Sequence, residues 1–165
     1  MLDPKQRNGF PPGDMKFLEI IDKFQWHVMS VAPRIGEGGE SFSYSTGLFM
    51  RFKHPEIILF GLDPDISQQI INGIGKIVEA GKPFEMNRDY ADVFADEVMC
   101  RFRPVLPAHY REYVGWSLWF YEQELFPLFQ CFWPDKNGRY PWEKECHPDV
   151  AGCQPLLYLQ PPSVM

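Results

Sequence analysis

The sequence predicts an α+β fold, in which a mostly antiparallel, curved sheet of about five or six strands is covered by two or three helices. Residues 57–62 form an apolar run without a polar side, which is typical of a strand buried on both faces of a sheet. Asp63 and Pro64 follow directly and are suited to the cap and the first position of a helix. Upstream, aromatic residues and threonine alternate with serines over residues 41–46, which indicates a half-buried strand that Gly47 ends.

The helix that begins at Pro64 has a clear helical pattern. Its apolar residues recur at helical spacing and predict one buried stripe, formed by Ile66, Ile70, Ile74, Ile77 and Val78. Gly81 is suited to the position just after the helix, where a left-handed backbone closes the last turn. The strand, the cap and the helix therefore form the best-defined unit of the predicted fold.

The N-terminal part begins with a segment rich in proline and glycine. Residues 1–13 are predicted to form a flexible arm, and residues 14–165 a single globular domain with an irregular C-terminal tail. Asp14 is suited to cap a short first helix. Residues 26–32 alternate as a strand, and residues 34–40 are a glycine-rich acidic loop.

The rest of the chain predicts a mixture of strands and short helices. Residues 49–53 are expected to be a simple connection between two strands. The later elements are, in order, a strand or hairpin arm, an aromatic-rich helix, a last strand, an Asn-Gly turn and an irregular tail, at residues 92–105, 107–120, 127–133, 135–138 and 139–165.

Composition and charge restrict the classes of function. The formal net charge is −6 and the sequence pI is about 5.2, which argues against a general nucleic-acid-binding surface. No apolar run approaches the roughly 18 to 20 residues that span a bilayer. The N-terminus is polar and proline-rich rather than a signal peptide, so we expect a cytoplasmic location without membrane association.

The cysteines do not show the spacing of a metal site. Cys100, Cys131, Cys146 and Cys153 lack paired C-x-x-C spacing, and without a secretory signal they are predicted to be free thiols. Cys146, His147 and Cys153 are close together, but their spacing is not that of a zinc site, so no metal is predicted. The chain has no Walker loop or dinucleotide fingerprint, and the sequence identifies no cofactor.

One group of residues suggests catalysis. Ser43, Tyr44 and Thr46 on a predicted strand are followed within a short distance by His54. A histidine that reaches a serine or tyrosine hydroxyl could act as its base, provided that the two strand ends converge. There is no G-x-S-x-G elbow, and the alternative is a structural histidine before Pro55 and strand hydroxyls without a chemical role.

A second group suggests anion binding. Arginine, histidine and tyrosine gather in the second half of the chain, at Arg101, Arg103, His109, Tyr110 and Arg139. Arginine binds phosphate and carboxylate groups through paired N–H donors. The alternative is that these arginines pair with surface carboxylates such as Glu97 and Asp135.

Aromatic residues are unusually frequent, at 16% of the chain. Beside the arginines they could stack a flat ligand or form a homodimer face, although packing in the core is the simpler use. The residues concerned are Trp116, Trp119, Phe120, Tyr121, Phe129, Phe132, Trp133 and Trp142.

Several short motifs resemble a known family. They are WHV at 26–28, FSYSTGL at 42–48, HPE at 54–56, FGL at 60–62, RFRPV at 101–105, HY at 109–110, WFY at 119–121, FP at 126–127 and WPD at 133–135. Over residues 26–157 the chain is similar to the bacterial family called domain of unknown function 4262. It departs from that family at Ser45, where threonine is commoner, and in the N-terminal arm. The resemblance implies one domain in a bacterial cytosol and no established activity.

Two functional hypotheses follow. The preferred one is a non-catalytic module that binds a small anionic ligand or a protein partner through the arginine group. The alternative is a hydrolase or transferase with a histidine–hydroxyl site, formed by His54 with Ser43 or Tyr44, near the central strand.

Overall fold

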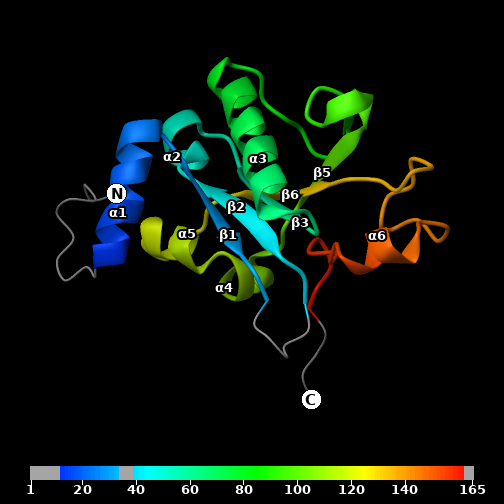
Figure 1. The fold of residues 1–165 in the computed structure, drawn as a ribbon. Coiled ribbons are helices and arrows are strands. Elements are labelled where there is room, and N and C mark those ends of the chain that lie inside the picture. Colours follow the sequence, from blue (N-terminus) through cyan, green and yellow to red (C-terminus); the bar gives the residue numbers. More distant parts are fainter. Residues whose placement is uncertain (1–11, 34–38, 162–165) are drawn as a thin grey trace.

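One six-stranded sheet is the framework of the computed structural model, which describes residues 12–33 and 39–161 (Figure 1). The strands lie in the order β1-β2-β3-β6-β5-β4. Their bounds are His27–Val31 for β1, Phe42–Thr46 for β2, Glu56–Phe60 for β3, Asp89–Tyr90 for β4, Cys100–Pro104 for β5 and Leu128–Phe132 for β6. All pairs are antiparallel except β3 with β6, which confirms the predicted α+β class and the mostly antiparallel sheet.

Two of the helices are long, and the others are short. The long ones are α1 (Pro12–Phe24) and α3 (Pro64–Glu79). The short ones are α2 (Leu48–Phe52), α4 (Tyr110–Tyr113), α5 (Gly115–Phe120) and α6 (Pro148–Gly152). Within the described ranges, no helix is long and apolar enough to cross a membrane.

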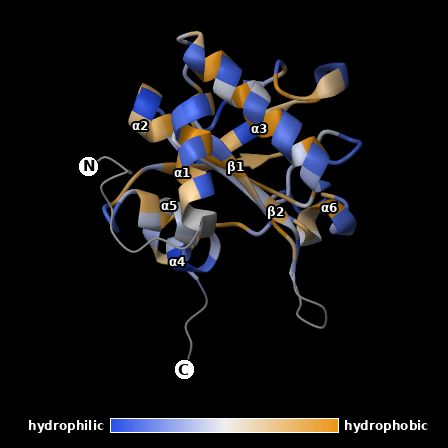
Figure 2. Cartoon of the chain, turned by 60° about the vertical axis from the view of Figure 1, so that its left-hand side comes forward, coloured by the Kyte–Doolittle hydropathy of each residue, from blue (hydrophilic) through white to orange (hydrophobic). Residues whose placement is uncertain are grey.

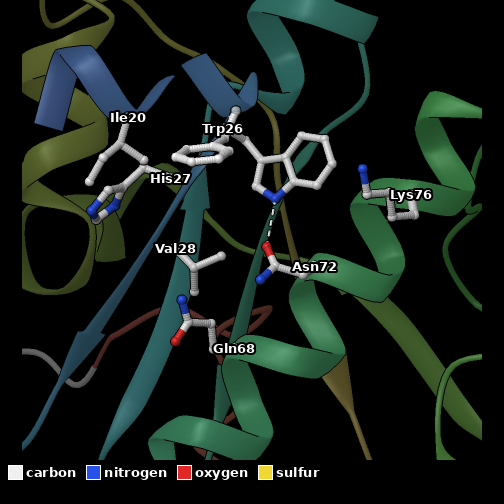
Figure 3. A pocket seen from close by; sticks show the side chains of 8 residues that line it. Ile20, Trp26, His27, Val28, Gln68, Asn72 and Lys76 are labelled. Carbon is white, nitrogen blue, oxygen red and sulfur yellow. Dashed lines mark hydrogen bonds between the residues drawn. The ribbon is translucent and has the colours of Figure 1, made fainter. Parts of the chain in front are cut away.

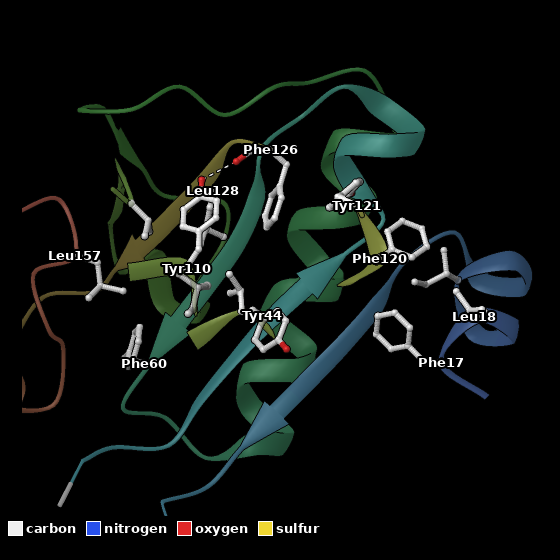
Figure 4. Packing of buried hydrophobic residues seen from close by; sticks show 14 residues of the cluster. Phe17, Leu18, Tyr44, Phe60, Tyr110, Phe120, Tyr121, Phe126, Leu128 and Leu157 are labelled. Atoms are coloured by element: carbon white, nitrogen blue, oxygen red, sulfur yellow. Dashed lines mark hydrogen bonds between the residues drawn. The ribbon is translucent and has the colours of Figure 1, made fainter. Parts of the chain in front are cut away.

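The helices cover the two faces of the sheet and enclose a hydrophobic core on each. Helix α3 packs over β1, β2 and β3, and Figure 2 shows hydrophilic and hydrophobic bands alternating along it. The opposite face is covered by α1, α4 and α5 and includes Tyr44, Phe120 and Leu157 (Figure 4). Every residue of β3 is buried, as predicted for a central strand between two layers.

Strand β2 is more buried than its alternating sequence predicts. Ser43 and Ser45 are as inaccessible as Tyr44, because β2 lies between β1 and β3 and α3 covers it. The serine hydroxyls are satisfied within the protein, since Ser43 Oγ lies 2.8 Å from Ser30 Oγ and Ser45 Oγ donates to Glu56 Oε1 at 2.8 Å. The prediction of a half-exposed strand is therefore wrong, and these hydrogen bonds make the burial of the hydroxyls tolerable.

Helix α3 is capped as predicted, and its buried stripe is turned relative to the predicted one. Asp63 accepts a hydrogen bond from the Asp65 N–H at 2.9 Å, and Gly81 has φ of 91° just after the helix. Ile74 and Val78 are buried as predicted, and Ile70 and Ile77 are partly buried against the same core. Ile66, however, is 50% exposed, and the other buried positions are Ser67, Ile71 and Gly75. The stripe is turned because the Trp26 indole packs on the side-chain-free surface of Gly75.

Several local expectations also change. Residues 49–53 are not a simple connection, because α2 occupies most of them, and residues 107–120 are divided among a 3₁₀ turn, α4 and α5. The turn at 135–138 has positive φ only at Gly138. The first helix begins at Pro12, ahead of Asp14, while residues 1–11 and 34–38 lie outside the described residues. The C-terminal segment, predicted to be irregular, contains α6, and Gln130 of β6 anchors it to the sheet.

Candidate functional site

Arg101 and Arg103 lie on β5 and share one face of it. The period of two along a strand sends Cys100 and Phe102 into the core under α3 and both arginines to the other side. There they meet aromatic rings from the C-terminal segment, Tyr140, Trp142 and Tyr158. The structure therefore brings the two strand arginines together, as the sequence predicts. We call these five side chains the arginine–aromatic face.

The Arg103 guanidinium lies between two aromatic rings. Its Cζ is 3.9 Å from the centre of the Trp142 ring and 4.4 Å from that of Tyr158. Its Nε is buried without a hydrogen-bond partner, and within the described part of the chain the side chain forms no ion pair. Stacking therefore fixes the guanidinium while its charge remains unneutralised.

Arg101, by contrast, is neutralised. Its Nε donates to Asp89 Oδ1 at 2.9 Å, and this hydrogen bond raises the pKa of Arg101. Its Cζ lies 5.4 Å from the centre of the Tyr140 ring. Asp89 also accepts a hydrogen bond from the Tyr140 hydroxyl at 3.2 Å, so one carboxylate orders both groups.

Strand β6 forms the floor that holds the rings in place. Gln130, which lies opposite Arg103 in the β5–β6 ladder, donates to the Pro155 carbonyl at 2.7 Å and accepts from the Leu157 N–H at 3.3 Å. Phe132 packs edge to face against Trp142, with ring centres 5.1 Å apart. A buried amide and an aromatic contact therefore attach the C-terminal segment to the sheet.

The other predicted anion-binding residues have separate partners. His109 Nε2 donates to the Leu159 carbonyl at 2.6 Å, beside the ring-bearing residue Tyr158. The Tyr110 hydroxyl donates to the Phe126 carbonyl at 2.6 Å, and burial raises the pKa of Tyr110 to about 12. Arg139 pairs with Glu145 at 2.5 Å. The alternative of ion pairing therefore holds for Arg101 and Arg139, although the carboxylates are not those expected.

The residues of the catalytic hypothesis have unrelated partners. His54 Nδ1 donates to the Pro55 carbonyl at 2.9 Å, and His54 Nε2 accepts the Phe84 N–H at 3.0 Å. The hydroxyl of Tyr44 accepts the Trp116 N–H at 3.3 Å, and that of Thr46 lies 2.7 Å from Ser117 Oγ. Both His54 nitrogens are occupied, and no hydrogen bond joins this ring to Ser43, Tyr44 or Thr46.

The occupied His54 ring leads to a prediction about pH. Burial lowers the pKa of His54 below its ordinary 6.5, so the folded state resists protonation of an imidazole that the unfolded chain protonates readily. The contribution to stability is complete above pH 6.5 and is lost as pH falls toward the lowered pKa. Glutamine can still accept the Phe84 N–H, so we expect His54→Gln to reduce the loss of stability below pH 6.5.

Urea denaturation of both proteins at a series of pH values checks this expectation. Burial lowers the pKa of His27 as well, so wild type and His54→Gln should both keep the part of the pH dependence that His27 contributes. Identical pH dependence of the two proteins would contradict the proposed titration of His54.

A buried carboxylate that no sequence motif indicated lies at the start of β3. Glu56 is fully buried at the start of β3, and its carboxylate accepts hydrogen bonds from the backbone N–H groups at the start of α2, from Ser45 and from the Tyr121 hydroxyl. Burial raises the pKa of Glu56, and these hydrogen bonds oppose the shift. In the sequence, the glutamate at the start of an otherwise apolar strand is the one feature that could have indicated this buried group. Because the carboxylate is enclosed, we interpret it as structural.

The tail residues considered for metal binding serve other contacts. Cys146 Sγ lies 3.4 Å from the Arg139 carbonyl oxygen, and Cys153 Sγ 3.4 Å from that of Val150. His147 Nδ1 accepts the Asp149 N–H at 3.1 Å. In the described ranges no three metal-ligating side chains come together, and all four cysteines are free thiols, as predicted.

Comparison with known proteins identifies the family. The model of the family described as Domain of unknown function (DUF4262) matches residues 20–147. No curated protein and no solved structure gives a match. The matched segment contains the whole sheet and both strand arginines. Because it covers more than half of the chain, the protein belongs to the DUF4262 family.

Proposed function

We propose that this protein is a non-catalytic binding domain whose arginine–aromatic face recognises a small anionic ligand. The observation that carries the proposal is the unpaired guanidinium of Arg103, held between Trp142 and Tyr158. In a chain of net charge −6, a neighbouring carboxylate would be the ordinary partner of such a group. Arg101 and Arg139 both have one, at Asp89 and Glu145.

The chemistry of the face favours a phosphate or carboxylate on a flat molecule. A guanidinium offers planar, paired donors that match both groups, and the two rings restrict its orientation. Because the guanidinium is already ordered, a ligand loses little additional conformational freedom of the protein on binding. Trp142 and Tyr158 are partly exposed, so their rings can make aromatic contacts with a planar ligand body. The occupied ring nitrogens of His54 support binding rather than nucleophilic chemistry.

Titration with phenyl phosphate and benzoate tests this function. We expect both probes to shift the Arg103 Nε–H and Trp142 indole N–H resonances in NMR spectra. A hydrogen bond to a charged group contributes about 1.5–3 kcal/mol, so Arg103→Ala should weaken binding by roughly ten- to a hundredfold. Arg103→Lys should lose much of the affinity too, because an ammonium does not reproduce the planar stack.

Arg88→Ala is the matched control. Arg88 is also an arginine near a ring, 5.9 Å from the centre of Tyr90, but it pairs with Glu85 at 2.7 Å. Its removal should leave the affinity for both probes unchanged. Thermal melting of each variant separates loss of binding from loss of folding. Equal probe affinity in wild type and folded Arg103→Ala would refute the proposal.

A further inference from the structure

A second candidate site lies at the opposite edge of the sheet. An open cavity of about 440 Å³ is lined by residues of α1, the edge strand β1 and α3 (Figure 3). This volume is within the range of about 300–1,000 Å³ that is typical of small-molecule sites. Strand β1 and strand β5 are separated by β2, β3 and β6, so this cavity is distinct from the arginine–aromatic face.

The apolar wall of the cavity is built around Trp26. Its indole is fixed by a hydrogen bond from Nε1 to Asn72 Oδ1 at 2.9 Å and by close packing on Gly75. Val28 of β1 and Ile20 of α1 also line the cavity (Figure 3). These side chains offer a hydrocarbon or aromatic ligand a surface that is already ordered.

The polar wall consists of donors from successive turns of α3. Because the indole occupies Asn72 Oδ1, the Asn72 amide retains its NH₂ group for other contacts. Gln68 lies one turn earlier, and Figure 3 shows both amides extending from α3 toward β1. Lys76 lies one turn later, with Nζ 5.6 Å from the centre of the Trp26 ring. An ammonium and two amides together favour a ligand rich in acceptor oxygens.

We propose that this cavity binds a small monocarboxylate with an apolar body. The body would contact Trp26 and its apolar neighbours, and the carboxylate would accept hydrogen bonds from Lys76 and the α3 amides. A singly charged group is favoured over a phosphate dianion because Glu79 Oε1 lies 3.9 Å from Lys76 Nζ. Gln25 holds the same carboxylate with a hydrogen bond of 2.6 Å, so this negative charge stays beside the cavity.

His27 also lines the cavity, but its ring packs against Phe17 of α1, with ring centres 4.7 Å apart. Burial lowers the pKa of His27, so its ring adds no positive charge at physiological pH. Lys76 is therefore the cation of the lining.

The test uses phenylbutyrate and hexanoate, with phenylbutyramide and hexanamide as uncharged counterparts. The readout is the NMR resonance of the Trp26 indole N–H, which lies beside the cavity. We expect the acids to shift this resonance in a saturable manner and to bind about tenfold more tightly than the amides. Lys76→Met should remove this difference, while Lys82→Met, an exposed lysine outside the cavity lining, should retain it.

Gln68→Trp gives a second test that does not depend on charge. Gln68 is exposed on α3, so a larger side chain there can fill the cavity without disturbing the core. A folded Gln68→Trp protein should not bind either acid. Arg103→Ala should bind both normally, which separates this site from the arginine–aromatic face. Equal affinities for acids and amides in wild type, or absence of a saturable Trp26 shift, would overturn the proposal.

Discussion

Replacement of Glu56 with alanine is expected to lower the free energy of unfolding by about 3–5 kcal/mol, because it leaves several buried donors without their acceptor, at a cost of about 1–3 kcal/mol for each unsatisfied group. The carboxylate accepts from the N–H groups of Gly47, Leu48 and Phe49, so its loss leaves these donors buried or poorly paired. It also accepts from Ser45 of β2 and Tyr121, which follows α5. One side chain thus connects two strands and two helices.

Urea denaturation of Glu56→Ala and Glu56→Gln measures this contribution. Glutamine keeps the volume and one acceptor oxygen but points an NH₂ group at N–H donors, so we expect a smaller loss of about 1–3 kcal/mol. Glu85→Ala is the control, because Glu85 is exposed and pairs only at the surface with Arg88. Its effect should remain within about 0.5 kcal/mol. A Glu56→Ala protein as stable as wild type would show that the network does not hold α2.

Two glycines of α3 are expected to respond to alanine with opposite signs. A Cβ built at Gly75 would lie 2.5 Å from Trp26 Cζ2, so Gly75→Ala must displace the indole or the helix. Overpacking of this kind typically destabilises a protein by about 1–3 kcal/mol. A Cβ at Gly73 would meet nothing within 4 Å, so Gly73→Ala should gain roughly 0.5–1 kcal/mol from better helix propensity.

The glycine pair separates packing from helix propensity because both positions lie within one helix. Thermal or urea unfolding gives the sign of each change, and the Trp26 indole N–H resonance reports whether the ring has moved. The pairing between Trp26 Nε1 and Asn72 should also weaken in Gly75→Ala. A stabilising effect at both positions would mean that the indole moves aside without cost. That result would also argue against a fixed indole as the apolar wall of the cavity between α1, β1 and α3.

Periodic patterns explain what the sequence could predict. The apolar run after Glu56 identified a central strand, and Asp63 and Pro64 identified the start of α3, because these features depend on neighbours in the chain. The alternation of β5 likewise placed Arg101 and Arg103 on one face. Residues close in sequence share these constraints, so no tertiary contact is needed to recognise them.

The composition of the arginine–aromatic face depended on longer-range contacts. The C-terminal segment was expected to be irregular, and no sequence pattern indicated that Gln130 anchors it and brings Trp142 and Tyr158 around Arg103. The sequence placed Arg139 in one predicted anion site with Arg103, but in the structure Arg139 forms an ion pair with Glu145. Partners far apart in sequence meet only after the sheet has formed, and no local pattern encodes them.

Which side chains are buried likewise depends on the tertiary structure, whereas the secondary structure follows from local sequence. The sequence by itself determined the α+β class, the main strands and the capped helix, because backbone geometry and side-chain period are local properties. Only the tertiary structure decided that the serines of β2 are buried, that Glu56 joins β2 to α2, and that Trp26 packs on Gly75. Each of these outcomes depends on which surface another element covers, and the chain reveals that only when its layers pack together.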